Sequence, residues 1–84
     1  MAKFIVTIFH LDKGDKTYIK DVFRYNKYND AFDGFTSLQK EGCDLWLSRD
    51  DKGDGNPIYI YNAKRGVVLR NTTLSEEEFK MLTE

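Results

Sequence analysis

The run "KFIVTIFHL" (Lys3–Leu11) places the strongest constraint on how this 84-residue chain can fold. Almost all of its residues are β-branched or aromatic, which favours a strand over a helix. Successive side chains of a strand point to opposite sides, and both sides here are apolar, with Phe4 and Val6 on one and Phe9 on the other. A strand of this kind belongs in the middle of a sheet, where its neighbours and the layers above and below cover it.

Four further segments alternate or cluster apolar residues in the manner of strands. They are Lys16–Tyr25, Cys43–Asp50, Pro57–Ala63 and Val67–Asn71. Val22 and Phe23 are adjacent apolar residues that interrupt the alternation of the first of these segments, so either a bulge or an early end of the strand is expected there.

Two segments have helical spacing instead. Between the second and third strands, apolar residues recur every three or four positions, and Asn29 and Gly42 have the residue types that cap a helix start and a left-handed helix end. Near the end of the chain, Ser75 and Glu78 have the spacing of a capping box, which predicts a terminal helix. Gly34 falls within the first helix and weakens it by about 1 kcal/mol relative to alanine.

The order of elements predicts an α+β fold: one antiparallel sheet of about five strands, in the order β-β-α-β-β-β-α, with the helices packed on one face. We expect residues 1–84 to form a single globular domain, since 40% of them are apolar and a chain of this length supports one modest core. The predicted core consists of Phe4, Val6, Ile8, Ile19, Phe32, Phe35, Leu38, Leu45, Leu47, Ile60, Val68 and Phe79.

The tetrapeptide "DKGD" occurs twice, at residues 12–15 and 51–54. In a calcium loop of the EF-hand type, oxygen ligands recur at alternate positions and a glutamate closes the loop. A loop starting at Asp50 would put Lys52 in a ligand position and Tyr61 in the closing position. We interpret both copies as turns and predict no metal or cofactor, although a weak cation site within residues 50–56 stays open.

The chain has few groups suited to catalysis. His10 and Cys43 are the single histidine and the single cysteine, they belong to different predicted strands, and no sequence rule brings them together. Motifs that cradle phosphate are missing from the sequence. Glu76, Glu77 and Glu78 are better explained as acids that oppose a helix dipole than as a catalytic cluster. We therefore predict that the protein is not an enzyme.

Several observations favour the cytoplasm. The sequence has no apolar run close to the ~20 residues that a membrane-spanning helix needs. Its start is interpreted as a first strand rather than a signal peptide. A single cysteine cannot form an internal disulfide and fits a reducing compartment.

Charge is balanced overall, at a net −1, but unevenly distributed along the chain. Residues 16–28 carry four bases and one acid, whereas residues 29–54 carry seven acids and three bases. Residues 55–73 are basic again, and the terminal segment is acidic. If these segments gather by sign in space, the fold would have one acidic and one basic side.

The first functional hypothesis uses the acidic side. A small, non-enzymatic protein-binding module would engage a basic surface of a partner protein, and an inhibitor of the phage or mobile-element type would occupy a nucleic-acid-binding surface in this way. The predicted acidic contacts are Asp44, Asp50, Asp51, Asp54, Glu76 and Glu77. The predicted aromatic anchors, where exposed, are Trp46, Tyr59 and Tyr61.

The alternative hypothesis is nucleic-acid binding by basic and aromatic residues of strands 16–28 and 57–70. Its predicted contacts are Lys16, Tyr18, Lys20, Arg24, Lys27, Lys64, Arg65 and Arg70. From Asn29 onward, the element order is also that of a double-stranded-RNA-binding domain. The last helix of such domains begins with lysines, however, and this one begins with three glutamates, which would repel phosphate.

Overall fold

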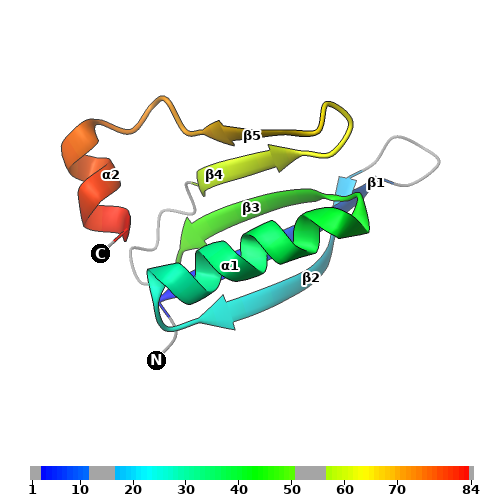
Figure 1. The fold of residues 1–84 in the computed structure, drawn as a ribbon, viewed down its shortest axis with the longest axis horizontal. Coiled ribbons are helices and arrows are strands. Elements are labelled where there is room, and N and C mark those ends of the chain that lie inside the picture. The colour runs from blue at the N-terminus through cyan, green and yellow to red at the C-terminus, as the bar shows by residue number, and fades with distance from the viewer. Residues whose placement is uncertain (1–2, 12–16, 51–56, 84) are drawn as a thin grey trace.

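The structure is a computed structural model that describes residues 3–11, 17–50 and 57–83. These ranges form a five-stranded antiparallel sheet, two α-helices and one short 3-10 helix (Figure 1). The elements are β1 (Phe4–Leu11), β2 (Thr17–Tyr25), α1 (Tyr28–Leu38), η1 (Gln39–Glu41), β3 (Asp44–Arg49), β4 (Pro57–Asn62), β5 (Val67–Arg70) and α2 (Glu76–Thr83). The predicted α+β class and the order of the elements are confirmed.

The strands lie in the order β2-β1-β3-β4-β5, and every neighbouring pair is antiparallel. β1 is therefore internal, as its two apolar sides predict. α1 connects β2 to β3 by crossing one face of the sheet in front of β1, and α2 lies beyond the end of β5 (Figure 1). A register shift between Ile8 and Phe9 marks a bulge in the β1–β2 pair, close to the predicted irregularity of β2.

The core lies between α1 and the face of the sheet that α1 covers. Its buried apolar residues are Phe4, Val6, Ile8, Ala31, Phe35, Leu45, Leu47, Ile58 and Leu82. Leu38 and Phe79 are half-buried against this cluster. The residues predicted for the core on β1 and β3 are all confirmed.

Three predicted core residues are exposed. Ile19 is 59% exposed because it pairs with Phe9, on the side of the sheet that neither of the described helices covers. Val68 is 44% exposed because β5 forms the edge of the sheet, away from α1. Phe32 is 36% exposed because it lies at the edge of the interface between α1 and the sheet. Ile60 is half-buried, on the side of the sheet opposite α1.

The cap predicted for α1 is wrong, but the predicted end is right. The helix starts at Tyr28, so Asn29 lies inside it, and the preceding residue Lys27 makes no side-chain cap hydrogen bond. Gly42 has a φ of 74° and ends η1, which follows α1 directly. This left-handed conformation is one that glycine adopts without steric strain.

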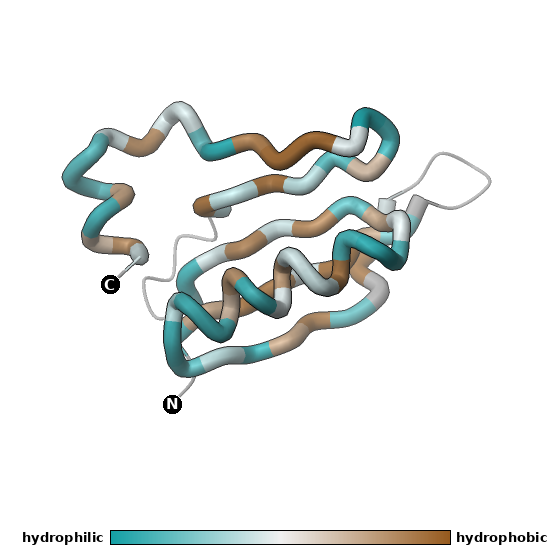
Figure 2. Tube along the Cα trace, in the orientation of Figure 1, coloured by the Kyte–Doolittle hydropathy of each residue, from teal (hydrophilic) through white to brown (hydrophobic). Residues whose placement is uncertain are grey.

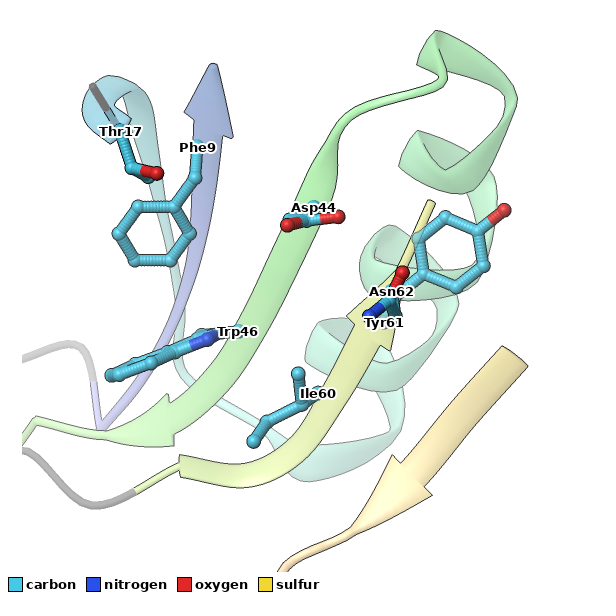
Figure 3. Close-up of a pocket in the computed structure, with 7 residues that line it drawn as sticks. All are labelled: Phe9, Thr17, Asp44, Trp46, Ile60, Tyr61 and Asn62. Atoms are coloured by element: carbon cyan, nitrogen blue, oxygen red, sulfur yellow. The ribbon is translucent and has the colours of Figure 1, made fainter. Parts of the chain in front are cut away.

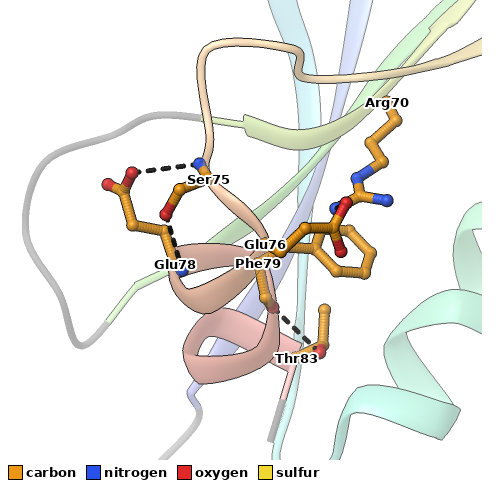
Figure 4. A network of polar contacts seen from close by, with 6 residues as sticks. All are labelled: Arg70, Ser75, Glu76, Glu78, Phe79 and Thr83. Carbon is orange, nitrogen blue, oxygen red and sulfur yellow. Dashed lines mark hydrogen bonds and ion pairs between the residues drawn. The ribbon is translucent and has the colours of Figure 1, made fainter.

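The capping box of α2 is confirmed. The Glu78 backbone N–H donates to Ser75 Oγ over 3.1 Å, and the Ser75 backbone N–H donates to Glu78 Oε1 over 3.0 Å (Figure 4). Arg70 of β5 also ties this helix to the sheet. Its guanidinium lies 3.7 Å from the centre of the Phe79 ring and 3.2 Å from Glu76 Oε1.

Gly34 in the middle of α1 has a packing role that the sequence does not reveal. A Cβ atom at this position would collide with the hydroxyl end of the Tyr25 ring, which lies against the helix backbone. Glycine therefore allows β2 and α1 to approach closely, which offsets its poor helix propensity.

We expect Gly34→Ala to destabilise the protein by about 1 kcal/mol, because overpacking costs about 1–3 kcal/mol and the gain in helix propensity is about 1 kcal/mol. In a Tyr25→Leu background the obstacle is removed, so the same change should stabilise by about 1 kcal/mol. Urea unfolding of the four proteins gives both values. An equal effect of Gly34→Ala in the two backgrounds would show that Tyr25 is not the cause.

Candidate functional site: the open face of the sheet

The side of the sheet opposite α1 carries a row of side chains that runs across all five strands. The register aligns Val22 with Thr7, Thr7 with Trp46, Trp46 with Ile60 and Ile60 with Leu69. Within the described ranges, no helix packs on this side. We call it the open face and define it by Val22, Thr7, Trp46, Ile60 and Leu69, with Phe9, Ile19 and Val67 beside them.

Trp46 lies at the centre of the open face. Its side chain is 37% exposed, and its ring meets the Phe9 ring edge-to-face at a centroid distance of 5.1 Å. Figure 3 shows the indole lying across the sheet between Phe9 and Ile60. The rings border a shallow hollow of about 230 Å³, which Thr17 and Asn62 also line.

The charged groups that border the open face are locally matched. At one end of β3, Asp44 Oδ1 accepts a hydrogen bond from the Ala63 backbone N–H over 2.8 Å. Beyond its other end, Asp50 accepts from Arg24, with 3.0 Å between the charged atoms. The described part of this face therefore presents apolar groups to solvent together with the exposed Asp44 carboxylate and the exposed Arg24–Asp50 pair.

The predicted acidic contacts do not gather on one described surface. Asp44 and Asp50 lie at opposite ends of β3, roughly 20 Å apart along the strand. Glu76 pairs with Arg70, and Glu77 is exposed on α2. Asp51 and Asp54 lie outside the described residues, as do both DKGD segments and most of the candidate cation loop. The acidic-face hypothesis stays a prediction.

Two of the three predicted aromatic anchors lie on the covered side instead. The Tyr59 ring contacts Phe32, Phe35 and Phe79 at centroid distances of 5.5, 6.4 and 5.7 Å, so it fills the space between the two helices. Tyr61 pairs with Leu45 and packs against the core, although it also belongs to the lining of the hollow in Figure 3. Trp46 is the anchor that the structure leaves accessible.

The basic residues proposed as nucleic-acid contacts are divided between the two edges of the sheet. β2 and β5 are separated by three strands, or about 19 Å. The lysine and arginine side chains of these two strands therefore cannot combine into one basic patch along a single edge. Arg24 and Arg70 each pair with an acid. Lys27, Lys64 and Arg65 are exposed, and Tyr18 packs edge-on against His10. Lys16 and the Lys20 side chain lie outside the described residues.

The structure brings His10 and Cys43 together, which the sequence did not predict. Cys43 Sγ lies 4.0 Å from His10 Nδ1, and both residues line a second hollow of about 610 Å³ at the end of β1. A thiol needs a base in good hydrogen-bonding geometry and a group that orients that base before it becomes an activated nucleophile. Here the contact is long, and the imidazole is exposed and packs against Tyr18, so the pair falls short of that arrangement.

The one strongly perturbed ionisable group described belongs to the core rather than to either hollow. Burial raises the pKa of Tyr28 well above its usual range, and its hydrogen bond to Tyr59 adds to this effect. The phenol therefore stays neutral near pH 7 and acts as a structural group.

The described residues also provide no metal site, since they bring no three histidine, cysteine or acidic side chains together as ligands. The α-helices of the described ranges, of 11 and 8 residues, are too short to cross a bilayer. Comparison with known proteins gives no match: no family model, no curated protein and no solved structure is significantly similar to the chain. The open face is therefore the main guide to function.

Proposed function

We propose that this protein is a non-enzymatic protein-binding module that receives an uncharged, apolar surface of a partner protein on its open face. The observation that carries the proposal is the row of side chains centred on Trp46, in which Trp46 and Leu69 are exposed, Val22 and Ile60 are half-buried and Thr7 is buried. Contiguous exposed apolar side chains on a small soluble domain are typical of interaction sites. Tryptophan is also among the residues that contribute most to binding energy when an interface buries it.

Charge decides the chemistry of the partner. Arg24 and Asp50 neutralise each other and Asp44 accepts one backbone hydrogen bond, so the centre of the open face around Trp46 favours an apolar partner surface. A nucleic-acid site, in contrast, requires lysine or arginine side chains that are free of ion pairs and lie beside the aromatic residues. We expect the module to act in the cytoplasm, in keeping with its single thiol, and to inhibit its partner only where the covered surface is itself functional.

The test begins with proteins captured from cells by the tagged chain. A partner that uses the open face should be lost when Trp46→Ser and Leu69→Ser are combined, because burial of such an anchor contributes about 2 kcal/mol or more, or roughly 30-fold in affinity. Met81→Ser is the matched control, since Met81 is an exposed apolar residue on α2, away from the open face. The captured protein is then purified and titrated directly.

Because Trp46 is the single tryptophan, 5-fluorotryptophan labelling gives one fluorine resonance for the centre of the site. The purified partner should shift this resonance in the otherwise unmodified chain and in the Met81→Ser chain. Retention of the partner by the double variant, or an unmoved resonance, contradicts the proposal. A shift caused by generic single- or double-stranded nucleic acid, with affinity falling steeply as salt rises, would establish the other class of partner.

A further inference from the structure

The outer edge of β5 is the second unusual surface of the molecule. Three consecutive apolar residues, Val67, Val68 and Leu69, are exposed on this four-residue strand. Figure 2 shows them as a hydrophobic stretch at the rim of the sheet, and Figure 1 places no described element beyond it. Exposed apolar edge strands readily pair with another strand.

The backbone groups available at this edge follow from the ladder between β4 and β5. The Asn71 N–H donates to the Ile58 carbonyl oxygen over 3.1 Å, and antiparallel pairs alternate between bonded and non-bonded positions. Val67 and Leu69 therefore bond inward to β4. Val68 and Arg70 direct their N–H and C=O groups outward, where a further strand could bind them.

The opposite edge of the sheet is protected against such pairing. β2 contains a bulge and carries the charged residues Asp21 and Arg24, and both features discourage an added strand. The β4–β5 register has no such shift. Since one edge is open and the other is blocked, pairing between copies of this chain joins β5 to β5, which closes as a two-fold dimer rather than growing into a filament.

We propose that the β5 edge binds β5 of a second copy of this chain in antiparallel register, with Val68 opposite Val68 of the partner copy. Charge excludes a register centred on Arg70, because that register would set two guanidinium groups face to face, whereas the register centred on Val68 places Arg70 opposite Gly66, which has no side chain. Val67 then lies opposite Leu69 of the other copy, and the two open faces continue into one apolar surface.

Sedimentation of the full chain over a concentration series tests the dimer. The mass should rise from 9.8 kDa towards twice that value. Val68→Pro removes the outward N–H but no bond to β4, and should weaken self-association roughly 10- to 100-fold, since each dimer loses two hydrogen bonds. If the proline variant does not fold, Val68→Lys replaces it as the test: it sets two positive charges opposite each other and should likewise weaken self-association. Val68→Ala, which keeps the N–H, should still dimerise.

Disulfide trapping tests the register. In a Cys43→Ser background, Val68→Cys should cross-link to its own copy faster than Leu69→Cys, because only residue 68 lies opposite itself. A chain that is monomeric at every concentration overturns the proposal. So does a dimer that Trp46→Ser abolishes and Val68→Lys leaves intact, or faster cross-linking at residue 69. A monomeric chain or faster cross-linking at residue 69 would leave the proposal for the open face standing, whereas a dimer that depends on Trp46 would mean that a second copy of the chain occupies that face.

Discussion

Replacing Phe35 by alanine should lower the free energy of unfolding by about 3–5 kcal/mol, a large part of what a domain of this size possesses. The Phe35 side chain is fully buried where α1 meets the sheet, so its removal leaves a cavity in the centre of the core. Urea unfolding should show a lower midpoint with an unchanged slope, because the native surface stays nearly the same.

Phe32→Ala is the matched control, since the two rings lie one turn apart on α1 and contact each other at 6.3 Å. Phe32 is 36% exposed, and its loss should lower the free energy of unfolding by only about 1 kcal/mol, largely through its ring contacts with Tyr28 and Tyr59. Equal losses for the two variants would contradict the placement of α1 on the sheet.

The different fates of Phe32 and Phe35 show the limit of the sequence patterns. Helical spacing places both residues on the apolar side of α1, but it does not say how far the sheet extends beneath that side. The two-sided apolar run of β1 correctly predicted an internal strand, because periodicity reports which sides of a strand are apolar. Whether a layer then covers each side depends on where the helices pack.

The same reasoning explains why the open face was missed. Trp46 alternates with Leu45 and Leu47, which correctly places it on the opposite side of β3 from the core. The sequence does not show that Trp46, Ile60 and Leu69 align across three strands, because that alignment depends on pairings between segments far apart in the chain. Tyr59 illustrates the opposite error: a polar aromatic residue that suggested an anchor is a packing element between the helices.

Arg49 connects the sheet to α2 and had no predicted role. Although charged, it is buried: its guanidinium lies 5.1 Å from the centre of the Phe4 ring and donates to the carbonyl oxygens of Met81 and Leu82 over 2.8 and 3.3 Å. The C-terminal end of a helix carries partial negative charge and leaves its last carbonyl groups without intrahelical partners. From the adjacent end of β3, Arg49 supplies a positive charge to the C-terminal end of α2 and hydrogen-bond donors to its last carbonyl groups.

Arg49→Met, which keeps most of the side-chain volume, should therefore lower the free energy of unfolding by about 2–3 kcal/mol and release α2 before the rest of the domain unfolds. Arg65→Met in the exposed β4–β5 turn is the control and should change the free energy of unfolding by less than about 0.5 kcal/mol. Amide hydrogen exchange locates the effect, because residues of α2 should lose protection while β1 and β3 keep theirs. Uniform loss of protection across the sheet would instead mean that Arg49 supports the core through Phe4, and that the attachment of α2 depends on Phe79 and Arg70.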